Sequence, residues 1–377
     1  MAVWTAWAER GRERRSMKKR EVFLDGLRVA ATCAVVMLHT ITGAMDITNM
    51  SEYPLEWKVF LAGLDLLCWC VPVFLMISGY LFLNPAREIG MGKMLTKYCR
   101  RILLALFVFG VPFALLEQVA TERCLRLDMV GRGILMVLRG ESWSHMWYLY
   151  RILFLYLLTP ALRWFLTRIP VWGVYLVQGL LLAVCSGLPC LCRVLGLGWG
   201  DQLPEEGIYL FYYICGYLFA AKAGSPPAAW KEKGAPAKEG GRHTSRKVWA
   251  MRGLCIFALL LAAGAVYGRL SGKYTLVMAY NHPMTAAFAL LIFWRSMYFR
   301  WNVPGKGAVL EKLGRLSFAV YLVHPVFLNL TYKFLHVTPL SFPLGLSLPV
   351  FFIGTLLLAT GTAWILHRLP PMRKYVV

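Results

Sequence analysis

The chain alternates between long apolar stretches and short basic segments. A helix needs about 20 mostly apolar residues to cross a bilayer, and ten stretches reach or approach that length. They are residues 22–45, 59–83, 102–119, 145–167, 171–190, 207–221, 249–270, 281–299, 314–336 and 344–367. The pattern predicts an all-α protein, a polytopic transmembrane helical bundle of about ten spans, of which the sixth is short.

The composition narrows the class of protein further. Of the 377 residues, 58% are apolar and 16% are charged, whereas a soluble domain has about 45–50% and about 25%. The net charge of +22 would suggest nucleic acid in a soluble protein, but here the basic residues lie between apolar stretches, which indicates a lipid bilayer as partner. Soluble enzymes, nucleic-acid binders and disulfide-rich secreted modules are excluded. No second Cys or His pair at zinc spacing accompanies Cys68-x-Cys70 or Cys190-x-Cys192, so no metal site is predicted. The sequence does not predict the oligomeric state.

The distribution of Lys and Arg predicts the orientation in the membrane. With a cytoplasmic N-terminus, 29 of the 41 basic residues fall in cytoplasmic segments and 8 in outer loops. Both termini are therefore predicted to be cytoplasmic. Residues 1–21 form a basic N-terminal segment and 22–370 form one membrane domain, which a Gly- and Pro-rich cytoplasmic linker interrupts at 223–247.

The loop at 120–144 is the exception to this charge rule. It places four Arg on the outer side, together with Glu122, Asp128 and Glu141. Its part at 129–138 is apolar enough to lie along the membrane interface.

The first span carries the most informative polar residues. Arg28 and His39 are eleven residues apart, so they lie within about 20° on one helix face and about 16 Å apart along the axis. Asp25 lies one turn before Arg28 and can pair with it. Charges inside a membrane are costly unless they are paired or solvated. We therefore interpret Arg28 and His39 as functional residues that face one cavity, with a packing role for His39 as the alternative.

Four sequence elements together resemble the acyltransferase-3 family of integral membrane acyltransferases. Arg28, ten residues and His39 resemble the Arg-x10-His motif of that family. The segments 71–82 (VPVFLMISGYLF), 145–149 (HMWYL) and 317–325 (SFAVYLVHP) resemble its second-span signature, the start of a middle span and its late Ser…Tyr-x-x-His element. The resemblance covers about residues 20–370, nearly the whole chain.

The resemblance implies an enzyme that transfers an acyl group, usually acetyl, from cytoplasmic acyl-CoA to a hydroxyl acceptor. The acceptor would be a sugar of a cell-envelope glycan or its lipid-linked precursor, and the location would be the bacterial plasma membrane. Acyl-CoA would be a co-substrate, and no permanently bound cofactor is expected. Because imidazole titrates near neutral pH, His39 could remove the acceptor proton or take the acyl group itself.

Basic residues at the cytoplasmic boundary are candidates for binding the CoA phosphates, which need fixed cations. They are Arg28, Lys97, Arg100 and Arg101. The family commonly shows Arg-x-x-Arg at this place, whereas Lys97 cannot form a bidentate fork. Positive-inside anchoring is the alternative for Arg100 and Arg101.

The ninth span carries a second group. His324 lies about 13 Å into that span, near the depth of His39, and Tyr321 and Ser317 lie one and two turns below it on the same face. We expect His324 to be catalytic, and Ser317 and Tyr321 to bind substrate. The alternative is a structural role, in which His324 forms a hydrogen bond to a neighbouring helix.

The fourth span begins with His145 and Trp147, which suit either a sugar ring or an aromatic belt. Arg151 lies about 9 Å deeper, and Asp65 of the second span is its expected partner. We expect His145 to take part in catalysis, and Trp147, Arg151 and Asp65 to bind the acceptor.

Two other functions share some of these features. A transporter or flippase of a small polar or glycan substrate would also have about ten spans and buried charges. It would favour inverted repeats and broken helix pairs, which the sequence does not show. A membrane sensor or accessory module is the third interpretation, but relatives of that kind carry a further catalytic domain that these residues do not contain.

Overall fold

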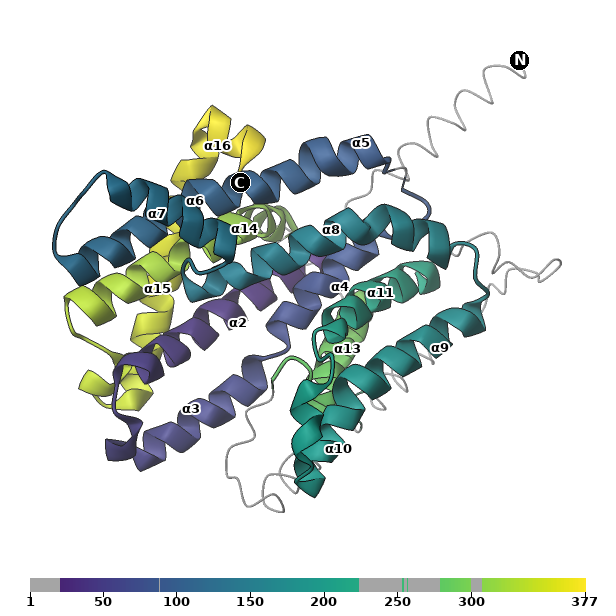
Figure 1. Cartoon of the computed structure of the whole chain (residues 1–377), viewed down its shortest axis with the longest axis horizontal. Helices are drawn as coiled ribbons and strands as arrows, with labels where there is room; N and C mark the ends of the chain where they lie inside the picture. The colour runs from purple at the N-terminus through teal and green to yellow at the C-terminus, as the bar shows by residue number, and fades with distance from the viewer. Residues whose placement is uncertain (1–20, 88, 224–252, 254–255, 257–278, 300–306) are drawn as a thin grey trace.

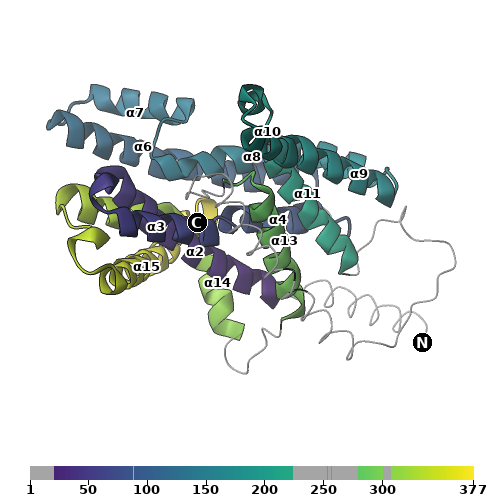
Figure 2. The same ribbon diagram turned by 90° about the horizontal axis from the view of Figure 1, so that it is seen from below.

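The computed structural model describes residues 21–87, 89–223, 253, 256, 279–299 and 307–377, and it is all-helical over them. The helices that build the bundle are α2 (Val22–Ile47), α3 (Pro54–Leu67), α4 (Cys70–Phe82), α5 (Met91–Lys93), α6 (Arg100–Glu122), α7 (Asp128–Arg139), α8 (Trp147–Leu166), α9 (Val171–Leu182), α10 (Leu188–Leu195), α11 (Gly207–Lys222), α13 (Pro283–Tyr298), α14 (Gly307–Asn329), α15 (Leu344–Arg368) and α16 (Pro370–Tyr375). In Figures 1 and 2, α9 and α10 lie on one flank of α2 and α4, and α15 lies on the other.

Seven helical segments of the described chain are long and apolar enough to cross a membrane. They are Val22–Ile47, Pro54–Phe82, Met91–Glu122, Ser144–Leu166, Val171–Leu195, Gly307–Phe334 and Leu344–Arg368. Each coincides with a predicted span, so the prediction of a polytopic helical bundle is confirmed.

The other three predicted spans have different outcomes. The stretches 207–221 and 281–299 form the 16-residue helices α11 and α13, which are shorter than the length of a straight crossing. The stretch 249–270 lies outside the described residues except for two positions. The N-terminal segment 1–20 and the linker residues 224–247 also lie outside them.

A close helix crossing joins α4 and α11, and glycine makes it possible. A Cβ atom at Gly79 would overlap the carbonyl oxygen of Tyr213, and one at Gly216 would overlap that of Met76. Small residues let helix backbones approach in a membrane. The crossing therefore requires glycine on both helices.

A second close crossing joins α2 and α14, the two helices that carry the candidate histidines. A Cβ atom at Gly314 would lie 2.9 Å from Oδ1 of Asp25. Asp25 is 1% exposed and pairs with Arg28 at 2.7 Å, which confirms the predicted pair. Gly314 thus leaves room for this buried carboxylate against α14.

Contacts between distant segments gather the basic segments at one end of the bundle. At the end of α8, Arg163 donates hydrogen bonds to the carbonyls of Phe82 and Asn84 at 2.7 and 3.0 Å. Arg101 donates from Nε to the carbonyl of Val376 at 3.0 Å, and α16 lies beside the long helix that α5 and α6 form (Figure 1). We call this end of the bundle, where 82–101, 163–168 and 368–377 meet, the basic end.

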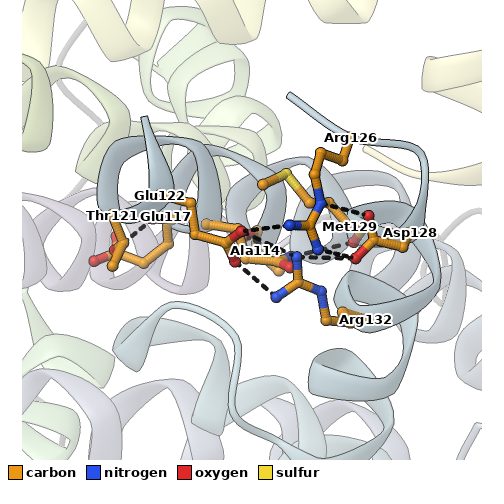
Figure 3. Close-up of polar contacts among 9 residues, drawn as sticks. Ala114, Glu117, Thr121, Glu122, Arg126, Asp128, Met129 and Arg132 are labelled. Carbon is orange, nitrogen blue, oxygen red and sulfur yellow. Dashed lines mark hydrogen bonds and ion pairs between the residues drawn. The ribbon is translucent and has the colours of Figure 1, made fainter. Parts of the chain in front are cut away.

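At the opposite end, a cluster of ion pairs holds the turn between α6 and α7 (Figure 3). Arg132 binds Glu122 and Arg126 binds Asp128, each at 2.7 Å. The hydrogen bond from Arg126 lowers the pKa of Asp128 to about 2, so the cluster stays ionised at physiological pH. Two of the four arginines of the loop 120–144 are therefore paired with carboxylates, which reduces the net positive charge of this loop.

The stretch 129–138 of this loop is helical and forms most of α7. One of its faces packs against α6 through Met129, Gly133 and Val137. Four of its other apolar side chains are exposed, namely Val130, Ile134, Leu135 and Leu138. The helix thus offers an apolar surface outside the bundle, as an interfacial helix requires.

Candidate active site

Two histidines from α2 and α14 meet inside the bundle. Nδ1 of His39 lies 3.0 Å from Nε2 of His324, and Nδ1 of His324 lies 3.1 Å from the carbonyl oxygen of Val320. A carbonyl oxygen only accepts, so Nδ1 of His324 carries a proton, and in the neutral ring its Nε2 accepts from Nδ1 of His39. This chain of hydrogen bonds leaves Nε2 of His39 unprotonated, as a general base requires.

His145 completes a cluster of three imidazoles. Its ring centroid lies 6.4 Å from that of His39 and 5.9 Å from that of His324. His145 is 3% exposed, and its backbone carbonyl accepts a hydrogen bond from the hydroxyl of Tyr321. Its Nε2 is buried and has no hydrogen-bond partner in the described part of the chain. Over the same residues, no group of three His, Cys, Asp or Glu side chains is arranged to hold a metal ion.

A cavity of about 530 Å³ extends from His39 and His145 to the basic end. We call it the arginine cavity, because four arginines line it: Arg28, Arg101, Arg315 and Arg373. Arg28 pairs with Asp25, and Arg315 pairs with Glu311. The other two arginines form no ion pair with any described residue. The cavity therefore offers fixed positive charge to an anionic ligand.

The rest of the arginine cavity is apolar and aromatic. Trp147, Tyr148, Tyr280 and Phe318 are among its lining residues. Trp147 packs against Tyr280, with ring centroids 5.4 Å apart. A ligand with a charged end and an apolar end fits such a lining.

A second cavity, of about 450 Å³, extends from the same two histidines toward the other end of the bundle. We call it the acidic cavity, because three carboxylates line it: Asp46, Glu117 and Glu141. Its cation, Lys333, binds both carboxylate oxygens of Glu117 at 2.8 and 2.9 Å. Its wall includes Trp143, whose ring stacks on Phe113 at 4.3 Å.

The two cavities meet at the histidine cluster. His39 and His145 line both of them, whereas His324 is fully buried behind His39. The arrangement places the imidazole of His39 where a ligand from one end of the bundle can meet a ligand from the other.

A comparison with known protein families agrees with this geometry. Residues 21–368, nearly the whole chain, match the family model described as an acyltransferase domain. The chain belongs to the acyltransferase-3 family. No curated protein and no solved structure matches it. The protein is thus a membrane acyltransferase, and the family resemblance drawn from the four sequence elements is confirmed.

Within this acyltransferase-3 protein, the structure brings together most of the predicted site residues. Arg28, Arg101, His39, His145, Trp147, Ser317 and Tyr321 all line the arginine cavity. Trp147, an expected acceptor-binding residue, lines the arginine cavity and does not line the acidic cavity. Ser317 donates to the carbonyl of Gly314 in its own helix, at 2.9 Å.

Two residues that were expected to bind CoA phosphates lie outside the cavity. Lys97 and Arg100 are exposed at the start of the α5–α6 helix. The guanidinium of Arg100 lies over the ring of Tyr375, at 5.2 Å. Arg101 points the other way because neighbouring residues on a helix differ by 100° in direction.

The predicted pair of Arg151 and Asp65 is wrong. Arg151 forms its ion pair with Glu206, at the start of α11, and its guanidinium lies over the ring of Tyr209. Helix packing places the start of α8 beside α11, which brings Glu206 to Arg151. Neither Arg151 nor Asp65 lines either cavity.

Sequence reasoning missed the residues that distant segments contribute. Arg373 reaches the arginine cavity from α16, and Trp143 reaches the acidic cavity from the loop before α8. In the sequence, Arg373 is one of three basic residues at 368–374, a pattern that indicates only positive-inside anchoring. In the sequence, only its position two residues before His145 indicates that Trp143 lies near the site.

Proposed function

We propose that this acyltransferase moves an acetyl group from cytoplasmic acetyl-CoA to a hydroxyl of a cell-envelope carbohydrate or its lipid-linked precursor. The observation that carries the proposal is the position of His39. It is bonded to His324 at 3.0 Å and lines both the arginine cavity and the acidic cavity.

The orientation follows from charge. The three segments of the basic end hold ten Lys and Arg and one acidic residue, whereas the loop 120–144 holds four Arg and three carboxylates, so the basic end faces the cytoplasm of a bacterial plasma membrane. The arginine cavity then receives acyl-CoA, and the acidic cavity opens to the outside and receives the acceptor. The substrates enter from opposite faces and meet at His39, which supports direct transfer over an acyl-His39 relay.

Donor binding uses the four arginines of the arginine cavity. The phosphates of CoA take charge-assisted hydrogen bonds from Arg28, Arg101, Arg315 and Arg373. Along α2, Arg28 and His39 are about 16 Å apart, so the extended arm of CoA is needed to bring its thioester to the histidines. The aromatic lining accommodates that arm.

In the proposed reaction, His39 moves one proton from the acceptor hydroxyl to the leaving sulfur of CoA. Nε2 of His39 takes the proton of the acceptor hydroxyl while its oxygen attacks the thioester carbonyl carbon. The carbonyl π electrons move to the thioester oxygen, which becomes an oxyanion beside the histidine cluster. When the C–S bond breaks, the CoA sulfur takes the proton from His39, which returns the site to its neutral state.

Release of CoA tests this function. The full chain, purified in lipid nanodiscs, is given acetyl-CoA with envelope polysaccharide or its lipid-linked precursor, and free CoA and base-labile acetyl are measured by mass spectrometry. We expect acetyl transfer by the wild type and none by a folded His39→Gln variant. Acetyl-CoA consumption that does not depend on His39 would contradict the proposal. Movement of labelled precursor into vesicles without acetyl transfer would favour the transporter or flippase.

A further inference from the structure

The acidic cavity carries an imbalance of charge. Lys333 binds Glu117 and its charge also acts on Asp46, but the side chains of Asp46 and Glu141 form no hydrogen bond or ion pair with any described residue. Both are exposed where they line the cavity. A cavity with two such carboxylates attracts cations and repels anions.

The helix α2 carries both the carboxylate of Asp46 and the imidazole of His39. Arg28 and Asp46 are 18 residues apart, which is five full turns, so they share the helix face that also carries His39. Asp46 lies about 10 Å beyond His39 along the axis. One helix face thus presents a cation, an imidazole and a carboxylate in that order.

A second observation indicates that the cavity takes a polar ligand. His145 is 3% exposed, lines the cavity and has an Nε2 atom without a partner. Nε1 of Trp143, in the same wall, is also buried without a partner. Buried polar atoms are nearly always hydrogen-bonded in folded proteins, so these two atoms mark places for ligand groups.

We propose that the acidic cavity selects an acyl acceptor that bears a protonated amine, and that it disfavours anionic acceptors. This inference rests on the proposed function, because it takes the acidic cavity as the acceptor site. The amine binds between Asp46 and Glu141, while the hydroxyl to be acylated lies at His39. The separation along α2 places the amine on a different ring or branch from that hydroxyl.

Three disaccharide probes of similar shape and different charge test the proposal. They are β-1,4-linked glucosamine dimer, cellobiose and cellobiouronic acid, which are cationic, neutral and anionic. The full chain in nanodiscs is titrated with each probe, with thermal stabilisation as the binding readout and O-acetyl product as the transfer readout. Two partly exposed ion pairs correspond to a preference of about tenfold for the glucosamine dimer over cellobiose. Cellobiouronic acid should bind most weakly.

Variants assign the preference to the two carboxylates. Asp46→Asn combined with Glu141→Gln should reduce the preference to less than about threefold, and Glu56→Gln, a carboxylate of α3 outside both cavities, should leave it unchanged. High salt should also weaken it, because exposed charge pairs are screened. Equal or tighter binding of cellobiouronic acid, or a preference that survives the double substitution, would overturn the proposal.

The two readouts separate this inference from the proposed function. A charge preference in binding without any His39-dependent acetyl transfer would support the cation site and contradict the transferase activity. Acetyl transfer without a charge preference would support the transferase activity and contradict the cation site.

Discussion

Nδ1 of His39 and Nε2 of His324 lie 3.0 Å apart, although the two residues are 285 positions apart in the chain. His39 faces the cavities and His324 stands behind it, bonded to the carbonyl of Val320. His39 is therefore the residue that can reach a substrate. His324 is a positioning residue that sets the tautomer and orientation of His39.

The first prediction concerns this pair. His39→Gln should lower kcat for acetyl transfer by at least about a hundredfold, the usual contribution of a general base. His324→Phe should also lower kcat, because it removes the hydrogen bond that Nδ1 of His39 makes to Nε2 of His324. His324→Gln should recover part of that loss, since its amide oxygen can accept the same hydrogen bond. CoA release in nanodiscs measures each variant.

A double substitution provides the control. Residues that act as one unit give non-additive losses, so His39→Gln with His324→Phe should be no slower than His39→Gln alone. Wild-type turnover by a folded His324→Phe variant would contradict the positioning role.

The second prediction separates two neighbouring arginines. Arg101 lines the arginine cavity and Arg100 lies outside it, over Tyr375. Arg101→Gln should raise KM for acetyl-CoA by about tenfold, the effect of losing one charge-assisted hydrogen bond, with little change in kcat. Arg100→Gln is the matched control and should keep the wild-type KM. Equal KM values for the two variants would remove Arg101 from the donor site.

The third prediction concerns the crossing of α4 and α11. Gly79→Ala should destabilise the protein by about 3 kcal/mol or more, because overpacking at this site forces two backbones apart. Gly354→Ala is the control, since a Cβ atom there meets nothing within 4 Å and alanine favours a helix. Thermal unfolding in detergent measures both variants. A stable Gly79→Ala variant would mean that the two helices do not cross at this residue.

The fourth prediction concerns orientation. Cys124 is exposed at the turn between α6 and α7, away from the basic end. A membrane-impermeant maleimide should label Cys124 in intact cells, and Cys124→Ser should lose that labelling. A cysteine introduced at the exposed Lys93, near the basic end, should react only after the membrane is permeabilised. The opposite pattern would invert the membrane topology and place the arginine cavity outside.

The sequence by itself determined what depends on a single helix. Apolar length located seven of the spans, and the 100° rotation per residue placed Arg28 and His39 on one face of α2. The same periodicity placed Asp25 beside Arg28, and the structure shows that pair at 2.7 Å. These relations are local, because the geometry of one helix fixes them without any neighbour.

Only the tertiary structure decided which helix faces meet. It joined His39 to His324, gave Arg151 the partner Glu206 in place of Asp65, and brought Arg373 into the arginine cavity. Such contacts depend on where helices cross, and those crossings depend on packing details such as the glycines of α4 and α11. Periodicity within one segment carries no information about the partner of that segment. For this reason the candidate histidine His39 could be identified from the sequence, whereas the shape and charge of the two cavities around it could not.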